Sequence, residues 1–215
     1  FQVTDIGFDR SMIGGYGHDD RGCAYPALMA VLDQKIPDDT VITILTDKEE
    51  TGSDGNTGLN SDYLRYFVAD LAMQEGLEPR HVLSRSACLS ADVNAAFDPT
   101  FASAYEANNA SFLNNGVVVT KYTGSGGKGG TSDASAEFMG RIRSLLDKKK
   151  VLWQVGELGK VDGGGGGTVA AYIANLDVDT IDVGVPVLCM HAPFEVISKA
   201  DLYETYRGYE AFLHM

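Results

Sequence analysis

Basic side chains are scarce in this sequence. Its 215 residues include 17 Lys and Arg against 30 Asp and Glu, which gives a formal net charge of −13 at pH 7. Because a protein that binds phosphates needs cations to neutralise them, this imbalance argues against a nucleic-acid partner or an anionic membrane. An acidic surplus is most often solvated surface. It is also what a site with several metal-binding carboxylates requires.

Cysteine and long apolar runs are scarce as well. The three cysteines, Cys23, Cys88 and Cys189, lie far apart among apolar neighbours, which is typical of free thiols and predicts a cytoplasmic protein. The absence of a CxxC pair argues against a zinc–thiolate site, and no apolar run is long enough to span a membrane. The first residues, FQVTDIGFDR, lack the pattern of a signal peptide and do not begin with Met. We therefore expect the sequence to be a piece of a longer chain.

Apolar runs of strand length alternate with amphipathic runs of helix length along the chain. We predict strands over 40–47, 81–92, 115–123, 151–157 and 182–191. We predict helices over 23–33, 61–76, 133–150 and 199–213, with a short helix after the glycine run at 162–168 and a flexible loop over 124–132. This alternation predicts an α/β protein in which residues 1–215 form one three-layer αβα domain with a mixed, mainly parallel sheet.

Polar residues of metal-binding type lie at four of the predicted turns or strand ends. They are found in the motifs GHDDRG (17–22), DKEETGSDG (47–55), SADVN (90–94) and CMHAP (189–193). Because strand ends of an α/β sheet meet in one crevice, Asp19, Glu49, Glu50, Asp92 and His191 could converge there. Carboxylate oxygen and imidazole nitrogen suit zinc, and they also accept manganese or cobalt.

The adjacent glutamates Glu49 and Glu50 could have different roles, one as a metal ligand and the other as a general base. In a site with two metal ions, Asp19 could bridge both, Glu50 and His191 could complete one, and Asp92 could serve the other. Glu49 would remain free to act as a general base on a nearby water. Each residue alone also has an ordinary explanation, as a helix cap, a loop charge, a turn residue or a hydrogen-bonded histidine. The joint pattern favours the metal site.

Five segments, in this order, carry a resemblance to a known family: FDRSMIGGYGHDDRGCAYPAL, TDKEETGSDG, SADVNAAFDP, GELGKVDGGGGGTVA and VGVPVLCMHAPFEVISKADL. They are spread over essentially the whole chain and resemble the aspartyl aminopeptidase family of co-catalytic zinc exopeptidases, especially its bacterial members. The resemblance implies that Asp19 bridges two zinc ions, that Glu50 and His191 bind the first, and that Asp92 binds the second. It implies that Glu49 is the general base in the hydrolysis of peptides with an acidic N-terminal residue, Asp or Glu, and that the protein is a homo-oligomer, a tetrahedral dodecamer.

The same resemblance suggests residues that contact substrate. Lys121, in VVVTKY, would face the first side chain of the peptide, where its charge suits an acidic residue; an exposed strand lysine is the equally good alternative. Lys128 is a weaker candidate. The backbone at Gly165 and Gly166 would line the peptide, and the alternative is a tight strand-to-helix turn. Neither glycine loop matches a phosphate-binding or dinucleotide-binding motif.

One part of the family pattern is not found. The family carries a further zinc-binding histidine in an HxD motif upstream of the bridging aspartate, followed by an inserted dimerisation domain. The histidines here are His18, His81, His191 and His214, and none lies in an HxD motif ahead of Asp19. His18 is a poor substitute by its context. We therefore expect a catalytic domain that is incomplete on its N-terminal side. A glutamyl or deblocking aminopeptidase of the same clan, with broader specificity, and an inactive metal-binding fragment that lacks one zinc ligand are the alternatives.

Overall fold

A computed structural model describes residues 2–125, 132–160 and 163–215. The predicted loop at 124–132, with Lys128, lies mostly outside these residues. The helices are α1 (His18–Leu32), α2 (Tyr63–Gln74), α3 (Pro79–Leu83), α4 (Ala136–Lys149), α5 (Ala170–Ala174) and α6 (Lys199–Phe212), with 3₁₀ turns at Glu49–Thr51 and Pro99–Ala104. The strands are β1 (Thr4–Ile6), β2 (Met12–Gly15), β3 (Ala87–Ser90), β4 (Asn94–Ala95), β5 (Val117–Thr120), β6 (Tyr122–Ser125), β7 (Ser132–Asp133), β8 (Trp153–Val155), β9 (Gly165–Gly166), β10 (Asp179–Gly184), β11 (Pro186–Leu188) and β12 (Glu195–Ser198).

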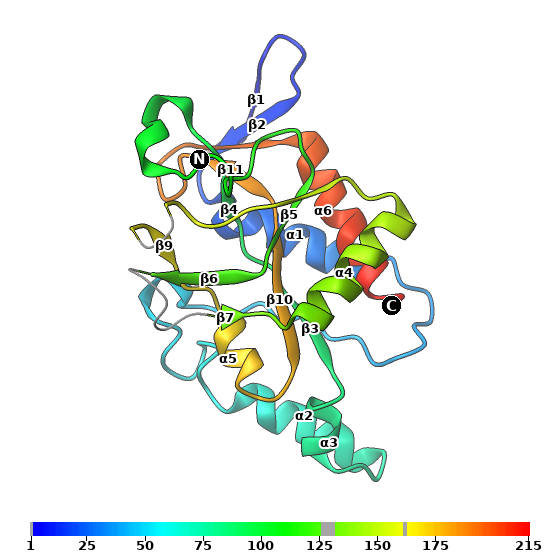
Figure 1. Ribbon diagram of the computed structural model, residues 1–215. Coiled ribbons are helices and arrows are strands. Elements are labelled where there is room, and N and C mark those ends of the chain that lie inside the picture. Colours follow the sequence, from blue (N-terminus) through cyan, green and yellow to red (C-terminus); the bar gives the residue numbers. More distant parts are fainter. Residues whose placement is uncertain (1, 126–131, 161–162) are drawn as a thin grey trace.

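Mixed sheets form the centre of the molecule (Figure 1). The central sheet has the strand order β3-β10-β5-β8, in which β3 pairs with β10 and β5 with β8 in parallel, while β10 and β5 are antiparallel. A second sheet has the order β1-β2-β12-β11-β4, and a third the order β7-β6-β9. The prediction of a mixed α/β fold is confirmed. Parallel pairing prevails in the central sheet only, because β2, β11 and β12 pair antiparallel, as do β6, β7 and β9.

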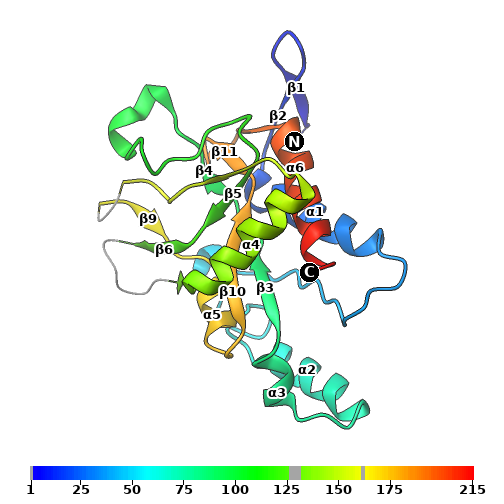
Figure 2. The same ribbon diagram turned by 45° about the vertical axis from the view of Figure 1, so that its right-hand side comes forward.

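The main core lies where α1, α4 and α6 pack on one face of the central sheet (Figures 1 and 2). Successive strand residues face opposite sides, so Ile181 and Val183 of β10 point into this core while Asp182 points to the side of α5. The apolar stripe of α4 consists of Phe138, Ile142 and Leu146, spaced four residues apart, and all three are buried. Each contributes roughly 1.5–3 kcal/mol through burial of its side chain. The sheet, these helices and α5 form the predicted three layers.

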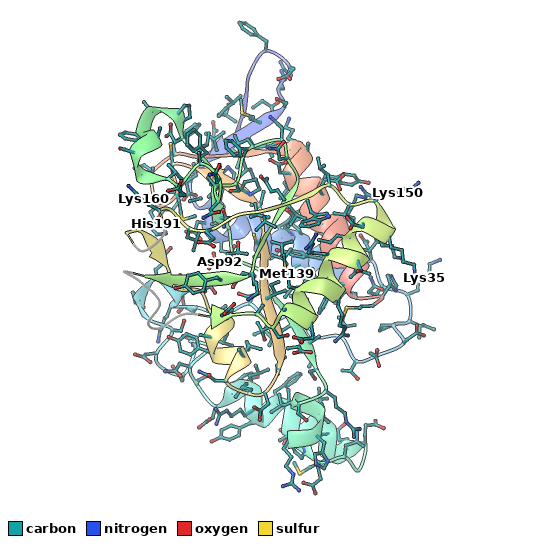
Figure 3. The ribbon with its side chains drawn as sticks, viewed as in Figure 1. Lys35, Asp92, Met139, Lys150, Lys160 and His191 are labelled. Carbon is teal, nitrogen blue, oxygen red and sulfur yellow. The ribbon has the colours of Figure 1, made fainter. Side chains whose placement is uncertain are left out.

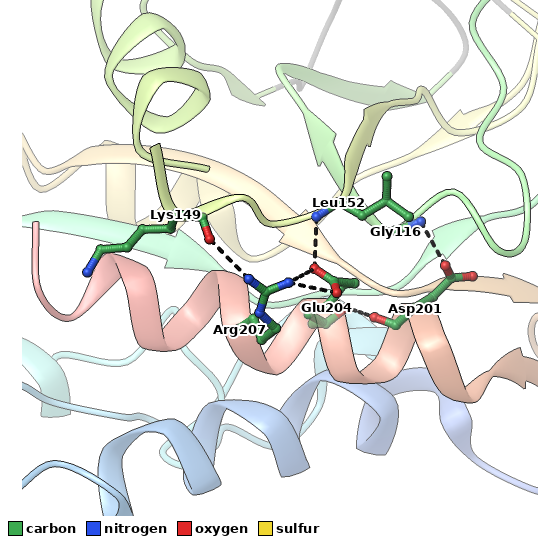
Figure 4. Close-up of polar contacts among 7 residues, drawn as sticks. Gly116, Lys149, Leu152, Asp201, Glu204 and Arg207 are labelled. Atoms are coloured by element: carbon green, nitrogen blue, oxygen red, sulfur yellow. Dashed lines mark hydrogen bonds and ion pairs between the residues drawn. The ribbon is translucent and has the colours of Figure 1, made fainter. Parts of the chain in front are cut away.

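Charged side chains of α6 fix this helix to the sheet (Figure 4). The carboxylate of Asp201 accepts hydrogen bonds from the backbone N–H groups of Asn114 (2.6 Å) and Gly116 (2.7 Å), just before β5. Glu204 accepts one from the N–H of Leu152 (2.8 Å), just before β8, and pairs with Arg207 at 2.8 Å. The start of two neighbouring strands is therefore held by one helix.

Several predicted elements are confirmed and others are wrong. The helices predicted over 61–76, 133–150 and 199–213 are α2, α4 and α6, and the helix predicted over 23–33 is the later part of α1. The strand predicted over 81–92 is half wrong, since Pro79 starts helix α3 and only Ala87–Ser90 is a strand. The predicted strand 115–123 is divided between β5 and β6, and 182–191 between β10 and β11.

The strand predicted over 40–47 is wrong. This apolar run has no strand pairing in the part of the chain that the structure describes. A strand needs a neighbour that satisfies its backbone N–H and C=O groups, and propensity alone does not provide one. The side chains of Ile42, Ile44 and Leu45 are consequently 39%, 44% and 62% exposed.

None of the helices in the described segments is long and apolar enough to cross a bilayer.

Candidate metal centre

Two carboxylates from distant parts of the sequence meet at the imidazole of His191. Its Nε2 atom lies 2.9 Å from Oδ2 of Asp19 and 2.9 Å from Oε1 of Glu50. Asp19 lies at the start of α1, Glu50 in the 3₁₀ turn, and His191 in the loop after β11. One imidazole nitrogen and two carboxylate oxygens within 4.8 Å of one another form a group that could hold a metal ion.

A second such group consists of Asp19, Asp20 and Asp92. Asp92 follows β3, and Figure 3 shows it together with His191 of the first group. Asp19 belongs to both groups, and its two oxygens allow it to face both. Asp20 was not among the predicted ligands; the doublet DD in the sequence was the only signal for it. Its buried Oδ1 atom has no hydrogen-bond partner within the described segments, as expected of an oxygen that awaits a ligand.

The acids of the two groups repel one another in a partly buried space. Burial, with Asp19 as a neighbour, raises the pKa of Asp20 to about 8. Burial and the Glu50 carboxylate raise the pKa of Asp19 to about 6. The pKa of Asp92 is raised well above its usual value, mainly by burial. Such crowding is relieved either by protons or by a bound cation, so the donor atoms and the charge both fit a metal ion.

Glu49 lies beside the metal groups without belonging to either. Burial raises its pKa, and the carboxylates of Glu50 and Asp19 raise it further. The 3₁₀ turn rotates successive residues by about 120°, so the two adjacent glutamates point in different directions. The loop that carries the turn is closed by hydrogen bonds from Ser53 N to Lys48 O (2.8 Å) and from Tyr172 Oη of α5 to Gly52 O (3.1 Å). A raised pKa beside potential ligands suits a general base.

Glu195 holds two of the potential ligands in place. This side chain is only 2% exposed, and its Oε1 accepts a hydrogen bond from the backbone N–H of His191 (2.8 Å). Its Oε2 accepts one from the backbone N–H of Asp19 (3.1 Å), 176 residues away. Sequence reasoning missed Glu195, although a single glutamate inside the apolar run PFEVI was a signal.

The remaining predicted residues, Lys121, Gly165 and Gly166, belong to neither metal group in the described segments. Lys121, which lies between β5 and β6, forms an ion pair with Asp133 of β7. Gly165 and Gly166 form β9, which pairs with β6. Gly165 has φ +100°, and a Cβ atom there would lie 2.0 Å from the Gly124 oxygen, so this pairing itself requires glycine.

A cavity of about 540 Å³ connects the glutamate turn with β7 and α5. Glu49 and Asp133 both line it, which brings the ion-pair partner of Lys121 to the same cavity as Glu49. His18 is buried, has no hydrogen-bond partner for Nε2 within the described segments, and belongs to neither metal group there.

Comparisons with known proteins match the chain over nearly its whole length. A family model described as aminopeptidase I zinc metalloprotease (M18) matches residues 2–213. The probable M18 family aminopeptidase 1 of Clostridium acetobutylicum is 50% identical over 217 residues, covering 99% of this chain and 47% of the relative. The corresponding protein of Thermotoga neapolitana is 47% identical, covering 99% and 48%. The chain thus spans about half the length of the curated relatives it matches.

Solved structures resemble the whole chain. The crystal structure of aminopeptidase I from C. acetobutylicum has a TM-score of 0.94 at 50% identity and covers 100% of this chain and 47% of that one. The M18 family aminopeptidase of Thermotoga maritima has a TM-score of 0.96 at 44% identity, with coverage of 100% and 48%. The yeast mApe1 dodecamer, at 21% identity and a TM-score of 0.82, covers 99% and 48% and shares the fold.

Proposed function

Because the chain belongs to the aminopeptidase I zinc metalloprotease (M18) family, we propose that it forms part of an enzyme that removes N-terminal residues from peptides. The observation that supports this most directly is the pair of ligand groups that share Asp19, with Glu49 beside them. Residues 1–215 would all belong to the catalytic domain.

The metal ligands follow from the two groups. Glu50 and His191 would hold one zinc ion, Asp92 the other, and Asp19 both; Asp20 is a further candidate for the second ion. Zinc, when bound, supplies Lewis-acid activation of water and of the peptide carbonyl. Manganese or cobalt could occupy the same oxygen and nitrogen ligands.

Glu49 would move the proton. Its carboxylate accepts a proton from the attacking water and delivers it to the leaving amine. Burial, the first cause of the raised pKa of Glu49, does not depend on the charges of the ligands and suits a group that accepts a proton. Glu195 would position the site by holding the backbone at Asp19 and His191.

We further propose a preference for peptides that begin with Asp or Glu. Lys121 would bind the acidic side chain, for which it must first leave Asp133. The competing proposal is a glutamyl or deblocking type of aminopeptidase with broader specificity. Rates on matched peptides that begin with Asp, Glu, Leu or Ala separate the two, since faster cleavage of Leu or Ala would contradict the acidic preference.

A second candidate function is a metal-binding fragment without activity. His18 belongs to neither metal group in the described residues, so no nearby histidine completes the second one. The zinc content of this chain would then be below two ions.

The enzyme proposal also includes assembly and location. We propose that the protein is a homo-oligomer, a dodecamer as in the yeast structure, and that it is cytoplasmic.

Glu49→Gln tests the enzyme. The variant keeps the size of the side chain but cannot accept the proton, so peptide hydrolysis should fall by roughly 10²–10⁴-fold while zinc content is unchanged. Glu75→Gln, at an exposed position after α2, is the matched control and should keep the full rate. An unchanged rate for Glu49→Gln, or a protein that hydrolyses no peptide when loaded with zinc, would favour the inactive fragment.

A further inference from the structure

The cavity of about 540 Å³ beside the glutamate turn is acidic where the structure describes it. Its volume lies within the usual range of about 300–1,000 Å³ for binding pockets. Two of the elements that line it, β7 and α5, lie side by side (Figure 1). Among its described lining residues only Glu49 and Asp133 are charged, and both are acids. A ligand in this cavity therefore meets Asp133 directly, whereas Lys121 is not among the described lining residues.

The ion pair between Asp133 and Lys121 follows from the register of two strands. Tyr122 of β6 lies opposite Asp133 of β7. Next to this position, the backbone N–H of Ala134 donates a hydrogen bond to the backbone oxygen of Lys121 (2.8 Å). The backbone of both partners is thus fixed by pairing. A bound peptide could separate the two charges by rotation of their side chains alone.

An acidic side chain of a peptide would compete with Asp133 for the same ammonium group. The side chains of Lys121 and Asp133 are 39% and 58% exposed, so both can be reached and the pair itself is weak. If the lysine leaves Asp133 to bind the new carboxylate, the existing ion pair is lost. If it stays, two carboxylates share one cation and repel each other. In both cases Asp133 weakens the binding of an acidic residue, and an uncharged residue avoids both penalties.

We propose that Asp133 is a specificity-determining residue, because its carboxylate competes with an acidic first side chain of the peptide for Lys121. Peptides that begin with an uncharged residue leave the ion pair intact. The acidic preference is therefore weaker than Lys121 alone would give, and the charge at position 133 sets its strength. This inference rests on the proposed function, since it concerns the peptide that the proposed enzyme binds.

The test compares Asp133→Asn with the wild-type chain, both loaded with zinc. The asparagine keeps the size of the side chain and removes its charge. The measured quantity is the selectivity ratio, which is kcat/KM for Asp-Ala-Ala divided by kcat/KM for Leu-Ala-Ala. Because an exposed ion pair of this kind is weak, we expect the ratio to rise by about three- to tenfold. Asp179→Asn is the matched control and should leave the ratio unchanged, since Asp179 forms an exposed ion pair with Arg141 and lies outside the described lining of the cavity.

Two further variants show whether Asp133 acts through Lys121. Asp133→Glu retains the charge and should keep the selectivity ratio near the wild-type value. In a Lys121→Met background, Asp133→Asn should change the ratio clearly less than in the wild type, because no ammonium group remains to be released. An equal change in both backgrounds would mean that repulsion alone acts, and it would refute the competition. The proposal is also wrong if Asp133→Asn does not raise the ratio, or if Asp179→Asn raises it equally.

Peptide binding separates a failure of this inference from a failure of the proposed function. In a Glu49→Gln background the same two peptides can be titrated by calorimetry without hydrolysis. There Asp133→Asn should tighten the binding of Asp-Ala-Ala about three- to tenfold relative to Leu-Ala-Ala. If this shift is found but the zinc-loaded wild type hydrolyses neither peptide, the proposed hydrolysis is wrong and the role of Asp133 stands. Hydrolysis with an unchanged selectivity ratio contradicts the role of Asp133 alone, and a chain that neither binds nor hydrolyses these peptides contradicts both.

Discussion

Replacing Asp182 with Asn should change how the stability of the fold depends on pH. Asp182 lies in the middle of β10, between the core residues Ile181 and Val183, and is 5% exposed. Burial raises its pKa from 3.8 to about 6, although the hydroxyls of Ser90 and Thr168 oppose this rise. The folded protein therefore keeps a proton on Asp182 over a pH range in which the unfolded chain has lost it.

The size of the effect follows from this difference. Each pKa unit corresponds to about 1.36 kcal/mol, so a rise of roughly two units corresponds to about 3 kcal/mol. Because the pKa is higher in the folded state, the favourable contribution of Asp182 is fully present below about pH 4 and is lost as the pH rises through about 6. The asparagine variant has no such titration. Relative to this variant, the wild type should lose up to about 3 kcal/mol of unfolding free energy between pH 4 and pH 7.

Urea denaturation at half-unit steps of pH, with a chelator present, measures this difference. Asp70→Asn, on the exposed surface of α2, is the matched control and should follow the wild-type pH profile. The absolute stability of Asp182→Asn decides nothing, because an uncharged amide is also buried there. If the free-energy difference between wild type and Asp182→Asn is the same at every pH, the inference that Asp182 is protonated near pH 5 in the folded state is refuted.

Three further predictions concern the metal centre and its surroundings. Asp19→Ala should remove all bound zinc, measured by elemental analysis after dialysis, because Asp19 belongs to both metal groups. Loss of only half the zinc would contradict the proposal that Asp19 binds both ions. Glu195→Gln should weaken zinc binding by about 10–100-fold in a chelator competition, because one of the two backbone N–H groups that Glu195 holds loses its acceptor. An unchanged zinc affinity would contradict the proposal that Glu195 positions Asp19 and His191. Gly165→Ala should lower the unfolding free energy by at least about 1–3 kcal/mol in thermal denaturation, owing to its φ of +100° and the backbone oxygen that its Cβ would meet. Gly167→Ala, where no atom lies within 4 Å of the added Cβ, should cost much less, and equal effects would contradict the steric argument.

The residues of the first metal group could be singled out from the sequence because the signal for each of them is local. Asp19, Glu50 and His191 stand in short polar motifs at the ends of elements, and such motifs are visible without knowledge of the fold. The structure brings these three together around one imidazole nitrogen. Glu195 could not be assigned in this way, because its role depends on a contact with a backbone group 176 residues away.

The wrong predictions concern strands, which form only beside another strand. The helices α4 and α6 carry their own hydrogen bonds and a clear apolar stripe, so their periodicity sufficed. The run at 40–47 has strong β propensity, but a strand exists only where another strand accepts its hydrogen bonds. The propensity of the run alone therefore could not decide whether it forms a strand.

The same run has a consequence for handling the isolated chain. Residues 41–46, VITILT, combine β-branched residues with no charge and no proline, which is the composition of segments that stack into cross-β fibrils. Asp38 and Asp39 precede the run and Asp47 follows it, so charges flank it on both sides as gatekeepers against self-association. These acids repel one another when the runs of two chains approach. Because salt screens this repulsion, the purified chain should aggregate more readily at high ionic strength.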